Sequence, residues 1–219
     1  SPWSTLTVFE VILLSMHGKS GYDAYVNGKI SKKKLQSVLK ALKESKQYWP
    51  SDTSTISWTE ANQKVMTGKA GFIVQGIWAA GAYHGNKKFN YEKDWGYVPF
   101  PGTEKYFDLN EDSFVYPKPN PSPKKTKEFL RYCGSKDGQA RFSKNKGAIP
   151  CRSDVDMSSF PKFQQDTNKD FGKTTAIGSL TSGLQTSTQQ LSQISTAMGN
   201  FVGNWNVDSS ASAMLKPLQ

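Results

Sequence analysis

The pattern of hydrophobic and polar positions predicts two helices near the start of the chain. Residues 5–16, TLTVFEVILLSM, are apolar along one helical face, which is typical of a buried helix. In the segment 32–48, Leu35, Val38 and Leu42 recur at helical spacing and lysines occupy the opposite side. That spacing predicts an amphipathic helix whose aliphatic stripe packs on a core.

The segment SWTEANQKVMTGKA, residues 57–70, predicts a helix with defined ends. Ser57 is a suitable N-cap, and Glu60 three residues later completes a capping box. Gly68 stands where a helix C-terminus favours glycine. The apolar run that follows predicts a buried strand at 70–75.

The remaining elements are shorter. Aromatic and β-branched residues bounded by prolines predict strands at 94–103 and 111–118. Capping and glycine signals predict helices within 120–135 and 135–152. The Ser- and Thr-rich stretch after residue 174 predicts a loop, followed by a helix from about Gln189. Alternating helices and short strands are typical of an α/β fold.

Lysine supplies most of the positive charge. The 219-residue chain has a formal net charge of +10 and a pI of about 9.5. Such a balance fits a nucleic-acid binder or a solvated lysine-rich surface. Arginine, which bidentate phosphate and base contacts favour, occurs only at Arg131, Arg141 and Arg152. The lysines also follow no single helical face, so we expect no nucleic-acid partner.

The cysteines, Cys133 and Cys151, leave two interpretations open. They form either one disulfide, as in an exported protein, or two free thiols. Neither lies in a C-x-x-C pair, and both histidines, His17 and His84, are distant in sequence. A zinc site is therefore not expected, and no apolar run approaches the roughly 20 residues that span a bilayer.

The sequence gives little support to an enzyme. It contains no nucleophile elbow around a serine, no P-loop and no G-x-G-x-x-G segment. Acidic residues are numerous enough to supply a glycosidase pair, but nothing sets two of them apart. We expect no catalytic residues and no cofactor, and glycoside hydrolysis stays an alternative.

Ligand binding has better support. Aromatic rings cover the C–H faces of a sugar, and carboxylate, ammonium and amide groups satisfy its hydroxyls. The chain offers both kinds of group at the ends of its predicted elements. Trp78 follows a predicted strand and stands between Gly76 and two alanines, Ala79 and Ala80, which leave its ring room to be exposed.

Several segments in order resemble the extracellular solute-binding proteins of ABC transporters, most of all the monosaccharide (glucose-type) binding proteins. They are SWTEANQKVMTGKAGFIVQGIWAAG, VPFPGT, DSFVYPK, FLRYCGSKDGQARFSKNKGAIPCR and DVDMSSFPKFQQ. The resemblance extends from about Trp3 to Gly183. It implies an extracytoplasmic protein, periplasmic or tethered at the cell surface, that delivers a glucose-like hexose to a membrane permease. A di- or oligosaccharide is the alternative ligand.

The resemblance also implies which residues contact the sugar. Two tryptophans, Trp58 and Trp78, would stack on the ring, while Asp112 and Lys146 would bond its hydroxyls. Trp3 is a further candidate. Glucose-type relatives often have a histidine near Ser182, and here a hydroxyl of Thr181 or Ser182 would take its place.

The fold implied by the resemblance is periplasmic-binding-protein-like, type II, with two lobes and the sugar in the cleft between them. This chain would cover most of the C-terminal lobe, with residues 1–115 and 156–219 in that lobe and 116–155 crossing to the N-terminal lobe. Its start without methionine suggests a mature or trimmed fragment whose N-terminal half is missing.

Overall fold

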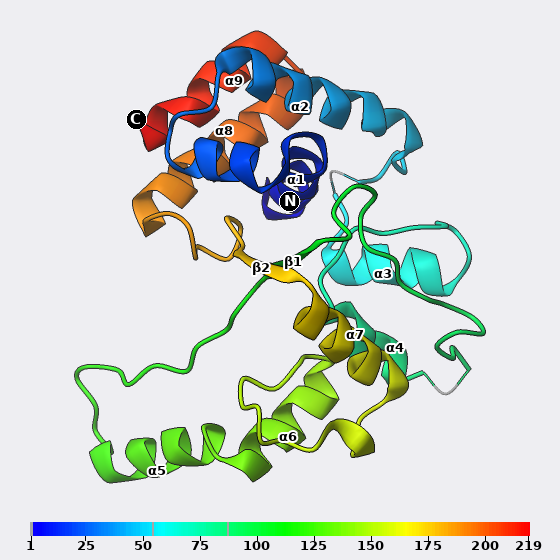
Figure 1. Ribbon diagram of the computed structural model, residues 1–219, viewed down its shortest axis with the longest axis vertical. Helices are drawn as coiled ribbons and strands as arrows, with labels where there is room; N and C mark the ends of the chain where they lie inside the picture. The colour runs from blue at the N-terminus through cyan, green and yellow to red at the C-terminus, as the bar shows by residue number, and fades with distance from the viewer. Residues whose placement is uncertain (1, 54, 87) are drawn as a thin grey trace. The chain divides into compact units, whose positions relative to one another are not determined.

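The computed structural model describes residues 2–53, 55–86 and 88–219 (Figure 1). It is a mixed α/β structure, rich in helices and with a small parallel sheet. The α-helices are α1 (Pro2–Val26), α2 (Lys32–Ser45), α3 (Trp58–Met66), α4 (Ala79–His84), α5 (Pro123–Cys133), α6 (Lys136–Lys146), α7 (Lys162–Lys173), α8 (Thr188–Asn204) and α9 (Val207–Leu215). The other elements are strands β1 (Tyr106–Leu109) and β2 (Thr175–Gly178) and 3-10 helices η1 (Lys46–Tyr48), η2 (Met157–Ser159) and η3 (Lys216–Leu218).

The chain forms two compact units. The first unit comprises Ser1–Val74, Val98–Asn110 and Thr174–Gln219. The second unit comprises Gln75–Tyr97 and Glu111–Lys173. Residues 116–155 thus fall wholly within the second unit, which also takes in stretches on both sides of them. Their assignment to an N-terminal lobe stays a prediction.

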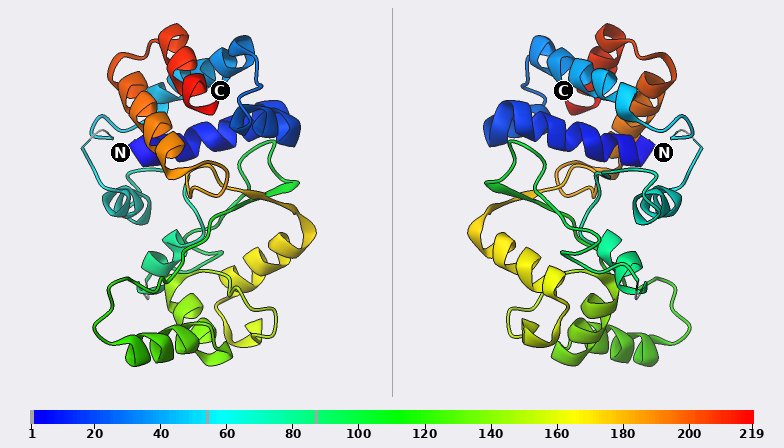
Figure 2. Two further views of the ribbon diagram at one scale, coloured as in Figure 1. Left: turned by 90° about the vertical axis from the view of Figure 1, so that its left-hand side faces the viewer. Right: turned by 90° about the vertical axis from the view of Figure 1, so that its right-hand side faces the viewer.

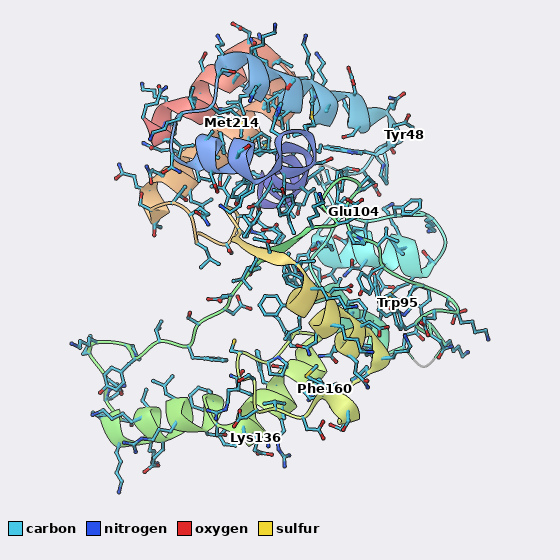
Figure 3. All side chains as sticks on the ribbon, viewed as in Figure 1. Tyr48, Trp95, Glu104, Lys136, Phe160 and Met214 are labelled. Atoms are coloured by element: carbon cyan, nitrogen blue, oxygen red, sulfur yellow. The ribbon has the colours of Figure 1, made fainter. Side chains whose placement is uncertain are left out.

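Four helices build the core of the first unit. Figure 1 shows α1, α2, α8 and α9 gathered together, and Figure 2 shows the same group from two further sides. Leu39 of α2, Met198 of α8 and Met214 of α9 are fully shielded from solvent in one cluster, and Figure 3 labels Met214. Burial of these apolar faces is the main stabilising contribution to the unit.

Helix α1 contains a break at Gly18. The residue has a φ of 60°, in the left-handed region that glycine adopts at little cost. The N–H of Lys19, just after the break, donates to Tyr106 Oη at 3.3 Å. The break therefore coincides with a contact between α1 and β1.

Strands β1 and β2 pair in parallel. The register aligns Tyr106 with Thr175 and Leu109 with Gly178. The N–H of Ser179 continues the ladder by donating to the Leu109 carbonyl at 2.8 Å. Both strands end at the same edge, where the turn 179–182 begins.

The second unit is built from α4 to α7 and an aromatic cluster. Tyr83 and Trp95 have ring centroids 4.8 Å apart, and Trp95 and Phe163 are 5.1 Å apart. Phe160 and Phe163 are buried, and Figure 3 labels Phe160 and Trp95. These rings form the core of the unit.

The predicted helices are confirmed. The stretch predicted at 32–48 forms α2 and η1, and the capping box of Ser57 and Glu60 is present at the start of α3. Helix α8 begins at Thr188, one residue before its predicted start. The C-terminal segment forms α9 and η3.

The predicted strands at 70–75, 94–103 and 111–118 are wrong. Apart from an isolated bridge between Tyr91 and Trp95, these stretches carry no strand pairing. A strand needs a neighbour for its backbone groups, and within the described residues only β1 and β2 form a ladder. Phe72, predicted to be buried, has 90% of its surface exposed. Sequence reasoning missed β1 and β2 themselves, which have four residues each.

Candidate functional site

Two of the predicted ligand-binding residues, 34 positions apart in the chain, lie together. Lys146 Nζ is 3.6 Å from Asp112 Oδ2 in an ion pair of the second unit. The Asp112 side chain is 72% exposed and that of Lys146 is 42% exposed. An exposed pair of this length contributes little to stability. Because both side chains are exposed, both charged groups are accessible to a polar ligand.

Close backbone packing between α4 and α6 positions Lys146. Lys146 is the last residue of α6, and Gly147 ends the helix with a φ of 82°. A Cβ atom on Gly81 of α4 would lie 2.7 Å from the Lys146 carbonyl oxygen. Only glycine allows this approach, so α4 fixes the end of α6.

Gln164 of α7 fixes the same turn from another side. The residue is fully buried, and its Nε2 donates to the carbonyl oxygens of Ser143 and Ala148 at 2.8 and 2.7 Å. The two carbonyls flank Lys146 in sequence. Two hydrogen bonds in a buried setting define the backbone from which the lysine side chain extends.

Trp78 belongs to this part of the second unit. It is the N-cap residue of α4, half-buried, and its ring packs directly over Gly76. A Cβ on Gly76 would lie 2.0 Å from the ring, so the bare glycine is what admits the indole. The structure thus places Trp78, Asp112 and Lys146 in one unit, joined through the contact of α4 with α6.

The other predicted residues lie in the first unit. Trp3 Nε1 donates to the carbonyl of Thr181 at 3.3 Å, and Ser182 Oγ donates to the carbonyl of Ser179 at 3.1 Å. Trp3 and the turn 179–182 therefore come together. Trp58 is the first residue of α3, with 44% of its surface exposed.

Sequence reasoning missed the part played by Glu10. This residue of α1 is 1% exposed and receives hydrogen bonds from the turn 179–182. Burial raises the pKa of its carboxyl group, while hydrogen bonds from Tyr22 and the turn oppose that rise. A lone acid inside the apolar helix 5–16 was a visible signal that this position has a specific partner.

Asp108 of β1 is the second acid of this region. Its pKa is raised to about 8 by burial and by the charge of Glu10. Its Oδ1 is buried and has no hydrogen-bond partner among the described residues. The two acids thus disfavour each other's ionisation.

The cysteines are both free thiols. Cys133 is half-buried and Cys151 is exposed. Gln139 joins the two positions, since its Nε2 donates to the Cys133 carbonyl and its Oε1 accepts from the Cys151 N–H. Gln139 of α6, and not a disulfide, therefore links Cys133 at the end of α5 to Cys151 beyond the end of α6.

Over residues 2–53, 55–86 and 88–219, no group of three or more His, Cys, Asp and Glu side chains is arranged to hold a metal ion. None of the helices in these ranges has the length and apolar character needed to cross a bilayer.

A groove of about 480 Å³ lies between α8 and α9, but none of the predicted ligand-binding residues lines it. Small side chains and asparagines form its walls. It lacks the aromatic rings and charged groups of the candidate site.

Comparison with known proteins gives relatives of one kind. The chain is 35% identical over 98% of its length to a xylose/arabinose-binding protein, XacG, of Haloferax volcanii, and covers 48% of that protein. It is 27% identical over 99% of its length to an uncharacterized ABC transporter extracellular-binding protein of Pyrococcus horikoshii, covering 49% of it. A probable sugar-binding periplasmic protein of Rhizobium meliloti is 25% identical over 82% of the chain, which covers 44% of that protein.

The chain spans about half the length of the curated relatives it matches. The family of bacterial extracellular solute-binding proteins matches residues 2–170. This match takes in well over half of the chain, including Trp3, Trp58, Trp78, Asp112 and Lys146. The protein therefore belongs to the bacterial extracellular solute-binding protein family.

Proposed function

We propose that this chain carries the sugar-contacting residues of an extracytoplasmic binding protein that delivers a monosaccharide to an ABC importer. The observation that carries the proposal is the pairing of Asp112 with Lys146 in the unit that also holds Trp78. A charged pair and an indole are the two kinds of group that contact a sugar. The names of the relatives, two of which specify sugar binding, support the same class.

The ligand proposed first is a glucose-like hexose, as the resemblance to glucose-type proteins implies. A pentose is the second candidate, because the Haloferax volcanii relative is named for xylose and arabinose. The hydroxyl groups of Thr181 and Ser182, where glucose-type relatives often have histidine, are compatible with either sugar. A disaccharide stays the third candidate.

The mechanism proposed is closure of two lobes over the sugar. Ligand favours the closed form only through contacts that it makes with both lobes. A membrane permease would then recognise the closed form. Contacts from an N-terminal half remain part of this proposal, as does an extracytoplasmic location with a membrane tether.

A tryptophan-fluorescence titration tests the ligand class. D-glucose, D-galactose, D-mannose, D-xylose, L-arabinose and maltose are added separately to the full protein. We expect a saturable change with at least one monosaccharide, because an indole that stacks on a sugar changes its environment. A saturable response to maltose alone would replace the monosaccharide by a disaccharide. No response to any sugar would contradict the carbohydrate proposal.

Asp112→Asn is expected to weaken sugar binding about tenfold without changing the melting temperature by more than about 1 °C. The carboxylate would lose its charge-assisted hydrogen bond to a hydroxyl, whereas the exposed ion pair adds little stability. Isothermal titration calorimetry and thermal unfolding measure the two effects. Asp154→Asn removes a comparable exposed pair, with Arg152, and serves as the matched control. Equal affinity in both variants would remove Asp112 from the site.

Trp78→Ala is expected to weaken binding about tenfold and to abolish most of the fluorescence response. The indole supplies the apolar surface on which the sugar ring would stack. Trp95→Phe is the control, because Trp95 packs against Tyr83 and Phe163 in the core of the same unit. An undiminished response in Trp78→Ala would show that another tryptophan reports the binding.

A further inference from the structure

The buried carboxyl group of Glu10 accepts hydrogen bonds from the turn that follows β2. Ser179 Oγ and Thr181 Oγ1 donate to Glu10 Oε2 at 3.0 and 2.9 Å. The N–H of Leu180 donates to Oε1 in a short hydrogen bond. Three successive residues of the turn are therefore held by one side chain of α1.

Tyr22 completes the arrangement from the far end of α1. Its hydroxyl donates to Glu10 Oε1 at 2.5 Å and accepts from the Leu180 N–H at 2.8 Å. Burial and the charge of Glu10 raise the pKa of Tyr22 far above its ordinary value, so the phenol stays a donor. Leu180 itself is fully buried and anchors the turn in the core.

Tyr22 of α1 and the hydroxyl and N–H groups of the turn donate to Glu10, which favours its ionised form but does not neutralise it. Two further titratable groups face Glu10: Tyr25 of α1 and Asp108 of β1. The charge of Glu10 raises the pKa of both, and Asp108 in turn disfavours ionisation of Glu10. No lysine or arginine in the described parts of the chain forms an ion pair with Glu10. A buried carboxyl group that has no cation beside it is costly, and an apolar side chain would fill the same space more favourably.

The geometry indicates a role for the carboxyl group of Glu10. Trp3 lies seven residues, or two helical turns, before Glu10 on the same face of α1. Trp3 Nε1 donates to the Thr181 carbonyl, while Glu10 holds the Thr181 hydroxyl. Ser182 is fixed in turn, since its Oγ donates to Ser179 O and its N–H lies 3.4 Å from Ser179 Oγ.

We propose that Glu10 is a positioning residue for ligand binding, which holds the turn 179–182 and Trp3 in the orientation that receives the sugar. This inference rests on the proposed function, because Trp3 and Ser182 are candidate sugar contacts. The carboxylate itself does not touch the ligand. It acts through the hydroxyl and backbone groups that it orders.

Glu10→Gln tests the proposal with a side chain of the same size. The amide retains an oxygen for Leu180 N–H and Tyr22, but its NH₂ group cannot accept from Ser179 or Thr181. We expect the affinity for D-glucose or D-xylose, whichever the wild type binds, to fall at least tenfold. Leu13→Ala is the control, since Leu13 is a fully buried residue of α1 that lies in the core cluster. It lowers stability, and we expect its affinity to stay within twofold of the wild type at a temperature where all variants are folded.

The pH dependence of affinity separates positioning from a loss of stability. As the pH falls through the raised pKa of Glu10, protonation removes an acceptor, so the wild-type affinity should fall. Glu10→Gln should bind weakly at every pH at which the wild type is compared, without that decline. If Glu10→Gln bound the sugar with the same affinity and pH profile as the wild type, the positioning role alone would be overturned. A wild type that binds none of the sugars would overturn the proposed function, and this inference with it.

Discussion

Gly147→Val is expected to lower the free energy of unfolding of the second unit by about 3 kcal/mol. Gly147 has a φ of 82°, which a β-branched residue adopts only with strain. A Cβ atom there would also lie 2.6 Å from the backbone nitrogen of Gly81. The backbone strain and the steric clash act together. The atom that the Cβ would meet belongs to the backbone, so it cannot move aside as the end of a flexible side chain could.

The same substitution should weaken sugar binding, because Lys146 immediately precedes Gly147. If α4 and α6 separate, the position of the lysine relative to Asp112 changes. Urea denaturation followed by circular dichroism measures the stability, and calorimetry measures the affinity. We expect the affinity to fall more than in Asp112→Asn, since several contacts move at once.

Two glycines provide controls for Gly147. Gly68, in the first unit, has a φ of 70°, but a Cβ atom added there would meet no other atom within 4 Å. Gly68→Ala therefore reports the backbone strain alone, as a loss in the unfolding free energy of the first unit. Gly172 has neither constraint, and Gly172→Ala in α7 should stabilise the second unit by about 0.5 to 1 kcal/mol. A loss in Gly147→Val no greater than that in Gly68→Ala would contradict the close packing of α4 on α6.

The helices that were predicted have local signals, whereas α4 and α7 were not predicted. The leucine stripe of α2, the capping box of Ser57 and Glu60, and Gly147 as a C-terminal glycine each act within one or two helical turns. Strands depend on partners elsewhere in the chain. The run 70–75 has strand-like residues but no ladder, whereas β1 pairs with residues nearly 70 positions away.

The candidate site, like the fold, was predictable only in part. The family resemblance named Asp112 and Lys146, and the structure brings them together. The resemblance could not show that Gly81 and Gln164 fix the backbone around Lys146, because those contacts are between helices. Glu10 stood out as a charge within an apolar helix, but its partners lie about 170 residues away.

Asp108→Asn is expected to stabilise the protein at pH 8 by about 2 kcal/mol or more, and to have little effect at pH 4. In the folded protein the pKa of Asp108 is raised to about 8, above its ordinary value of 3.8. Folding therefore favours the protonated acid. The stability that this group contributes is fully present below about pH 4 and is lost as the pH rises to about 8. Each unit of pKa corresponds to about 1.4 kcal/mol, and asparagine resembles the neutral acid at every pH.

The measurement is the difference in unfolding free energy between wild type and Asp108→Asn from pH 4 to pH 8. Using the difference cancels contributions from other acids. Asp94→Asn is the control of opposite sign, because hydrogen bonds from Asn90 lower the pKa of Asp94. There the wild type should be the more stable form throughout pH 4 to pH 8, and it should lose that advantage only in a further measurement below about pH 4, as the pH falls from the ordinary value of 3.8 through the lowered pKa. A constant difference for Asp108→Asn across the range would mean that its carboxyl group ionises as it does in water.

The effect of Asp108→Asn should also depend on Glu10. Burial is the larger cause of the raised pKa of Asp108, and the charge of Glu10 is the second. In a Glu10→Gln background only burial remains, so the gain at pH 8 should be smaller than in the wild type. A double-mutant cycle measures this coupling directly. Equal gains in both backgrounds would show that Glu10 carries no charge at pH 8.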